Sequence, residues 1–213
     1  MDFDTAYMIT ALVTMFVVVD PIAIAPLFLA LTPGMSDGRR RRIAWRAVLV
    51  GGFVLAVFAA FGEAVLGFIG ISMPAFRVAG GILLFITAFD MLFERRTKRR
   101  ADSAGADDHV EHDDPSVFPL AIPLIAGPGA IASVILLTGE KPGGEGLITV
   151  LVITALVLVV MALTLQASGY LERAIGKTGI NVITRLLGML LAALSVQFVL
   201  DGLAAFGFGP GAG

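Results

Sequence analysis

The chain of 213 residues contains no cysteine, which excludes disulfides, thiolate metal sites and thiol redox chemistry. Charge is also scarce, because Asp, Glu, Lys and Arg together make up 15% of the residues and hydrophobic residues 57%. With a mean hydropathy of +0.92, this composition is typical of a polytopic membrane protein rather than a soluble domain. Residues 1–7 hold no Lys or Arg, so we expect the first apolar segment to remain as a membrane span and not to be a cleaved signal peptide.

Six apolar stretches are long enough to cross a bilayer: residues 6–31, 45–70, 74–93, 117–138, 147–168 and 182–206. They predict an all-α membrane protein with six transmembrane helices, surrounded by a lipid bilayer. Thirteen of the fifteen Lys and Arg residues fall in or beside the loops that follow the odd-numbered spans. By the positive-inside rule these loops are cytoplasmic, so both termini lie outside. Because the basic residues cluster in these loops and the spans are nearly free of them, nucleic acid is not an expected partner.

Two of the predicted spans are interrupted near their middle. Asp20, Pro21 and Pro26 interrupt the first, and Pro128, between Gly127 and Gly129, interrupts the fourth. Each proline removes a backbone donor, and a carboxylate inside a bilayer costs at least about 2.5 kcal/mol on insertion scales. The pattern therefore predicts that spans 1 and 4 are discontinuous helices.

The two halves of the chain follow the same plan. Arg77 and Gly80 follow Pro21 at nearly the same spacing at which Arg185 and Gly188 follow Pro128. This predicts a repeat of about 108 residues with three spans in each copy. An odd number of spans gives the copies opposite orientations, which makes them inverted repeats. The predicted units are residues 1–93, a charged cytoplasmic linker at 94–116, and residues 117–213.

The linker contains His109 and His112 among several carboxylates. Such a tract is either a solvated charged segment or a weak site for a divalent ion, since nothing nearby would orient the ligands. We therefore expect no well-defined metal site there.

The two interruptions are the candidate binding site. Asp20 is suited to cap a half-helix that begins at Pro21, and a second half-helix begins at Pro128. Helix N-termini attract a carboxylate, whereas Asp20 and the carbonyls that end the first half-helices attract an ammonium group, a proton or Na+. A small zwitterion meets both demands, unless the breaks serve only helix packing. The predicted substrate site consists of Asp20, Pro21, Ile22, Ala23, Ala126, Gly127, Pro128, Gly129 and Ala130.

Supporting residues are also expected. Arg77 and Arg185 either reach the headgroups or brace freed carbonyls of the broken helices. Glu63 is a candidate titrating group, and Thr184 is a candidate for polar lining of the site. Gly176-Lys-Thr178 lacks the first glycine of a phosphate loop, because residue 171 is Leu, so neither ATP nor another cofactor is expected.

Five segments carry more specific patterns: VDPIAIAP at 19–26, FRVAGGILLF at 76–85, AIPLIAGPGAI at 121–131, TRLLG at 184–188 and VQFVLDG at 196–202. Together they resemble the MarC family of integral membrane proteins. The resemblance implies a bacterial or archaeal inner-membrane protein, and some members of the family are described as small neutral amino acid transporters. Many relatives read Asp-Pro-Ile-Gly-Asn where this chain has Ala23 and Ile24 after Asp20-Pro-Ile.

The sequence thus predicts a secondary transporter of glycine- or alanine-sized amino acids, coupled to H+ or Na+, and no enzyme. The alternatives are an exporter of another small solute and, outside transport, an intramembrane aspartyl protease that uses Asp20 and Asp90. Direction of flux, the coupled ion and homo-oligomer formation stay open at this point.

Overall fold

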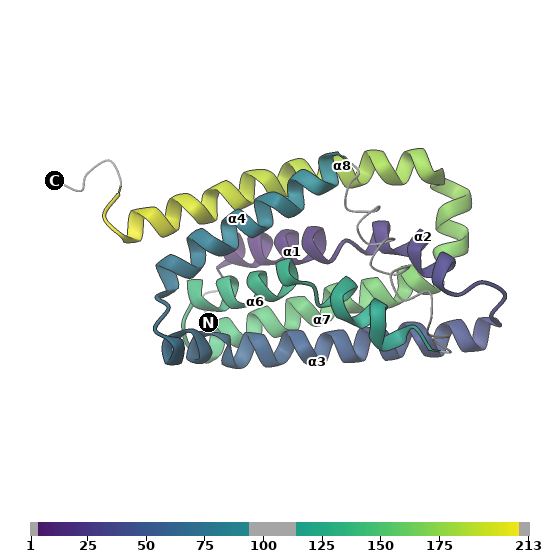
Figure 1. Ribbon diagram of the computed structural model, residues 1–213, viewed down its shortest axis with the longest axis horizontal. Helices are drawn as coiled ribbons and strands as arrows, with labels where there is room; N and C mark the ends of the chain where they lie inside the picture. Colours follow the sequence, from purple (N-terminus) through teal and green to yellow (C-terminus); the bar gives the residue numbers. More distant parts are fainter. Residues whose placement is uncertain (1–3, 94–113, 209–213) are drawn as a thin grey trace.

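The computed structural model describes residues 4–93 and 114–208, and within these ranges it consists of helices and short turns with no β-strand (Figure 1). The predicted all-α class is therefore confirmed for the described part of the chain. The elements in order are α1 (Thr5–Val19), α2 (Pro21–Leu31), α3 (Asp37–Ile69), α4 (Met73–Leu92), η1 (Ser116–Ile125), α6 (Pro128–Glu140), α7 (Gly144–Gln166) and α8 (Ser168–Ala205).

Five stretches are long and apolar enough to cross a membrane: Thr5–Leu31, Asp37–Ile69, Met73–Leu92, Gly144–Gln166 and Thr178–Ala205. A sixth crossing exists if η1 and α6 count as one span, because these two helices are joined at a bend of 52°. The described structure therefore supports the expected multi-pass membrane architecture with five to six spans.

The helices extend beyond the apolar stretches. Helix α3 already begins at Asp37 and includes the four arginines at 39–42, whereas the apolar stretch begins near residue 45. Arginine is a good helix former, so the helix continues past the part that hydropathy detects. Helix α8 likewise begins at Ser168, and its axis bends at Gly176, which has a positive φ of 68°. Only the portion after this bend is a candidate span.

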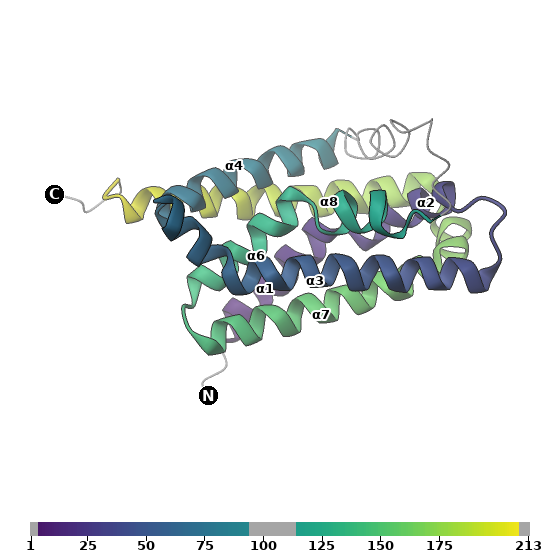
Figure 2. The ribbon, with the colours of Figure 1, turned by 60° about the horizontal axis from the view of Figure 1, so that its bottom comes forward.

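Helices α4 and α8 run along one edge of the bundle, α3 and α7 lie on the opposite edge, and α1 and α6 lie between them (Figures 1 and 2). Helix α6 accordingly contacts α1, α3, α4 and α7. Helix α1 begins and α8 ends at the same end of the bundle (Figure 1). The second half of the fourth predicted span therefore lies inside the bundle.

The α4–α8 pair is the most extensive helix contact of the described structure and depends on small residues. A Cβ atom at Gly81 would lie 2.8 Å from the Ser195 carbonyl oxygen, and one at Gly188 would lie 2.9 Å from Cβ of Met91. Apolar side chains gain little by leaving lipid, so close backbone approach is a main source of stability for such pairs. The two helices run antiparallel, and these close contacts fix the position of α4 on α8.

The end of the predicted linker contacts the first half of the chain. Asp114 forms an ion pair with Arg46 of α3, and its second carboxylate oxygen accepts a hydrogen bond from the backbone N–H of Ser116 at 3.0 Å. These contacts place the start of η1 beside α3. The remainder of the linker, including His109 and His112, lies outside the described residues.

Candidate functional site

The first interruption is centred on Asp20, which separates α1 from α2. Asp20 adopts a left-handed conformation with φ of 54° and ψ of 65°, and it is the only non-glycine residue with a positive φ in the described ranges. The residue before a proline is disfavoured in a right-handed helix, and Asp tolerates the left-handed region better than most residues. The Asp20 N–H still bonds to the Phe16 carbonyl at 2.9 Å, so Asp20 ends α1 in an ordered way.

The same residue begins the next helix. Oδ1 of Asp20 accepts a hydrogen bond from the Ala23 N–H at 3.3 Å, and Pro21 occupies the first position of α2, where its missing N–H costs nothing. The Asp20 side chain is fully buried. Asp20 is therefore a structural cap and also an acidic side chain deep inside the protein.

The second interruption has different local chemistry. Ala126, with φ of −90° and ψ of 63°, ends η1, and its N–H bonds to the Ala121 carbonyl at 2.8 Å. Helix α6 then starts at Pro128, and its N-cap residue is Gly127, which has no side chain to cap the helix. The N–H groups of Gly129 and Ala130 belong to the first turn, where no carbonyl of the same helix can accept them. This helix start therefore has a positive end without its own counter-charge.

The two interruptions lie side by side. A Cβ atom at Gly129 would lie 3.3 Å from Cγ1 of Val18 and 3.4 Å from Oγ1 of Thr87, so the start of α6 touches the end of α1 and the middle of α4. The Ser133 hydroxyl, one turn further along α6, donates to the Gly129 carbonyl at 2.9 Å and is fully buried. The tertiary structure thus joins segments that are more than a hundred residues apart in the sequence.

The residues of the predicted substrate site differ in exposure. Asp20, Pro21, Ala23, Ala126, Gly129 and Ala130 are buried, Ile22 and Gly127 are half-buried, and Pro128 is exposed. Val18 and Thr87 were not among the predicted site residues, although they are the nearest neighbours of Gly129. A signal for Thr87 did exist, because the shift that aligns Arg77 with Arg185 also aligns Thr87 with Ser195. Sequence reasoning overlooked this pair.

Arg77, one of the expected supporting residues, contacts a helix end away from the interruptions. Nη2 of Arg77 lies 3.5 Å from the Gly139 carbonyl oxygen, at the far end of α6 from Gly129. Glu63 is exposed on α3 and Arg185 is exposed on α8. Thr184 is buried, and its hydroxyl has no hydrogen-bond partner among the described residues. Of the two roles considered for Arg77, the contact matches bracing of a helix-terminal carbonyl.

No three His, Cys, Asp or Glu side chains come together as a metal-ligand group in the described ranges. Sodium binding near Asp20 therefore stays a prediction that rests on this one carboxylate and on neighbouring carbonyls.

Tyr7 was missed by the sequence reasoning and holds the other end of α6. Its hydroxyl donates a 2.7 Å hydrogen bond to the carbonyl of Leu137, and the bond is buried. Leu137 is among the last four residues of α6, whose carbonyls have no partner within the helix. Tyr7 therefore holds the start of α1 against the end of α6. At the opposite ends of the same two helices, Val18 lies beside Gly129.

We expect Tyr7→Phe to destabilise the protein by about 1–3 kcal/mol, because the buried Leu137 carbonyl loses the Tyr7 hydroxyl as a donor. Unfolding of the purified protein in detergent, followed by circular dichroism, measures this change. Tyr170→Phe is the matched control, since Tyr170 is 79% exposed and its hydroxyl should matter little. Equal stability of the two variants would show that the Tyr7 bond does not hold α1 to α6.

These features define a class: an apolar bundle whose described part has five to six membrane-crossing segments is a multi-pass integral membrane protein. Within that class, the chain belongs to the MarC family, whose model, described as MarC family integral membrane protein, matches residues 5–206.

Several relatives align over almost the whole chain. A UPF0056 membrane protein of Archaeoglobus fulgidus is 36% identical over 93% of this chain and 93% of its own. The UPF0056 membrane protein YvbG of Bacillus subtilis is 36% identical over 93% and 94%, and the UPF0056 inner membrane protein YhgN of Escherichia coli is 32% identical over 92% and 95%. No solved structure matches the chain.

Proposed function

We propose that this member of the MarC family is a secondary transporter of small neutral amino acids of the glycine and alanine class, driven by a proton or sodium gradient. The substrate binds where the end of α1 meets the start of α6. Its ammonium group, or the coupled cation, binds near the Asp20 carboxylate, and its carboxylate binds at the first N–H groups of α6.

The proposal is carried by the proximity of two complementary helix ends. Asp20 supplies a buried acidic side chain, and the start of α6, whose N-cap is a glycine, supplies backbone donors and the positive end of the helix dipole. The Gly129 contact with Val18 places these two features next to each other. An amino acid presents both charges on one carbon atom, so it can neutralise both helix ends at once.

Small side chains limit the size of the ligand. Ala23, Ala126, Gly129 and Ala130 are buried around the two helix ends. Even a methyl group at position 129 would be in van der Waals contact with Val18, Thr87 and Leu84. Packing this close leaves no room for a bulky ligand beside Gly129, which supports a substrate with no side chain or a methyl side chain.

The packing pattern supports a pseudo-twofold arrangement of inverted repeats with discontinuous spans 1 and 4. Helix α4 packs on α8, α3 packs on η1 and α6, and α7 packs on α1 and α2. If spans 1, 2 and 3 are exchanged for spans 4, 5 and 6, the same three sets of contacts result. Inverted repeats with broken helices bind their substrates at the repeat interface, near the membrane midplane.

The membrane and the orientation are also part of the proposal. The distribution of Lys and Arg places the turn between α2 and α3 in the cytoplasm and both termini outside. The relative from E. coli is named an inner membrane protein. We infer the same location here, where a proton or sodium gradient is available to drive transport.

The test is uptake of labelled alanine and glycine into proteoliposomes under imposed proton or sodium gradients. Alaninamide, which lacks the carboxylate, and propionate, which lacks the ammonium group, should both fail to compete, whereas unlabelled glycine should compete well. Leucine should compete poorly because of its size. Uptake no greater than in protein-free liposomes, or uptake insensitive to every gradient, would refute the proposal.

The same preparation separates the alternatives. An exporter of another small solute predicts no competition by glycine or alanine but gradient-dependent flux of a different compound in a substrate panel. An intramembrane aspartyl protease predicts cleavage of a helical substrate that Asp90→Ala abolishes. Asp90 is buried on α4, about one turn beyond Thr87. The transporter proposal expects no cleavage by either form.

A further inference from the structure

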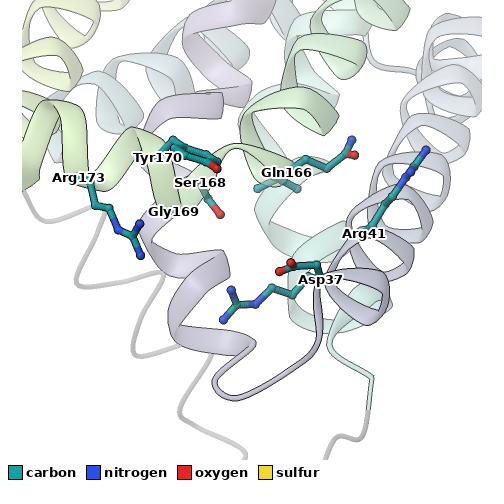
Figure 3. Close-up of a pocket in the computed structure, with 9 residues that line it drawn as sticks. Asp37, Arg41, Gln166, Ser168, Gly169, Tyr170 and Arg173 are labelled. Atoms are coloured by element: carbon teal, nitrogen blue, oxygen red, sulfur yellow. The ribbon is translucent and has the colours of Figure 1, made fainter.

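A second site lies at the end of the bundle opposite the start of α1, away from the helix ends proposed to bind substrate. It is a pocket with a volume of about 400 Å³, within the usual range of ligand sites, where the start of α3, the end of α7 and the start of α8 meet (Figure 3). Its polar lining includes Asp37, Arg40 and Arg41 from α3 and Ser168, Tyr170 and Arg173 from α8.

The pocket has an excess of positive charge. Three guanidinium groups and one carboxylate line it. Ser36 at the N-terminus of α3 makes no side-chain capping bond, and Asp37 in the first turn offsets the positive end of the helix, so the excess charge comes from the three arginines. The pocket is therefore suited to an anion and unsuited to a cation.

One of the arginines is held in place by the fold. Nε and Nη2 of Arg40 donate to the Thr32 carbonyl at 3.2 and 2.9 Å, which also satisfies the backbone at the end of α2. Arg41 and Arg173 are exposed. Figure 3 shows Arg173 and Ser168 directed toward the space beside Asp37, and Arg41 on the opposite edge near Gln166. The pocket thus has a fixed basic wall and two basic side chains at its rim.

We propose that this pocket binds a phosphate group. Guanidinium groups bind phosphate oxygens with two parallel hydrogen bonds, and the buried Ser168 and the start of α3 offer further polar contacts. The volume leaves room for an alcohol attached to the phosphate. The net positive charge of the pocket favours a ligand with a net negative charge over a zwitterionic ligand.

The position of the pocket indicates where such a phosphate is found. Tyr170 lines it and is 79% exposed, and Trp45 lies about one turn along α3 from Arg41. Aromatic residues of this kind gather at the headgroup level of a membrane. The positive-inside rule places this end in the cytoplasm, where basic pockets between helices bind anionic headgroups. The two sources to separate are therefore phosphatidylglycerol and free inorganic phosphate.

The lipid arm uses the full chain in phosphate-free detergent, titrated with short-chain phosphatidylglycerol or phosphatidylcholine and followed by native mass spectrometry. We expect preferential binding of phosphatidylglycerol. Arg173→Gln should weaken it by about fivefold, and Arg41→Gln together with Arg173→Gln by about 25-fold, from the usual contribution of one basic residue near an anionic surface. Arg173→Lys keeps the charge but loses the two parallel hydrogen bonds, so it should bind more weakly than the wild type and more tightly than Arg173→Gln.

Arg42→Gln is the matched control, because Arg42 is exposed on the same helix and does not line the pocket. It should change binding by less than about twofold, since its side chain does not line the pocket and cannot form the paired hydrogen bonds with a phosphate there. The soluble arm adds inorganic phosphate without lipid and measures the unfolding temperature. A rise that Arg173→Gln removes assigns the site to soluble phosphate, whereas retention of phosphatidylglycerol alone assigns it to the membrane. Equal binding of the two lipids without any effect of phosphate, or an equal loss in Arg42→Gln, would overturn the proposal.

Discussion

Asp20→Asn is expected to reduce gradient-driven alanine flux by about 10- to 100-fold, because a loss of this size corresponds to one hydrogen bond to a charged group. Asparagine tolerates the left-handed conformation found at position 20 and is as good a helix cap as aspartate. Its side-chain oxygen can therefore still accept from the Ala23 N–H, and the junction of α1 and α2 should remain. Only the negative charge that pairs with the ammonium group or coupled ion is removed.

Two control variants separate the loss of charge at position 20 from a loss of stability. Glu145→Gln removes a carboxylate at the exposed start of α7 and should leave flux unchanged. Asp20→Ala removes both charge and cap, so it should lose flux and also about 0.5–2 kcal/mol of stability. Asp20→Asn should therefore unfold at nearly the wild-type temperature while transporting poorly. Wild-type flux in Asp20→Asn would mean that the Asp20 charge takes no part in transport.

Gly81→Ala is expected to destabilise the protein by about 1–3 kcal/mol, which is typical for overpacking a tight contact. The new methyl carbon would lie 2.7 Å from Cγ2 of Val199, 2.8 Å from the Ser195 carbonyl oxygen and 3.0 Å from the Val199 nitrogen. Two of these atoms belong to the backbone of α8, so rotation of a side chain cannot relieve the contact. The two helices must separate, and α4, which carries Thr87 beside Gly129, must shift with them.

Gly67→Ala provides the matched substitution. Gly67 lies in α3, is exposed, and has no atom within 4 Å of where its Cβ would be. Because alanine is the better helix former, this change should be neutral or should stabilise by up to about 1 kcal/mol. Unfolding of both variants in the same detergent, and flux measured on the folded fraction, tests the pair. If Gly81→Ala were as stable as Gly67→Ala, α4 and α8 would not be packed as closely as described.

The apolar spans could be predicted from the sequence because a membrane helix depends on local chemistry. A stretch of about 20 apolar residues forms a membrane helix whatever its neighbours are. Pro21 and Pro128 each begin a helix in the structure, whereas Pro26, which was also expected to interrupt the first span, lies inside α2 without ending it. The irregular shape of η1 was not predicted. Its backbone departs from helical geometry at Phe118 and Ile122.

The neighbours of the candidate site could not be predicted in the same way. Thr87 reaches Gly129 only because of the rotation and vertical register of α4 against α6, and Tyr7 reaches Leu137 only because α1 runs antiparallel to α6. Helices that are apolar on most sides carry little periodic signal about which face meets which partner. Arg77 shows the same limit, since its place in the sequence suggested a role at the breaks and its contact is with the far end of α6.

By itself, the sequence determined that this is a membrane protein of the MarC family with paired prolines inside apolar segments, because hydropathy and proline act through the local chain. Only the tertiary structure decided that the end of α1 adjoins the start of α6, and that arginines from α3 and α8 share one pocket. Such contacts follow from how glycine and alanine surfaces let helices approach, and this packing involves residues far apart along the chain.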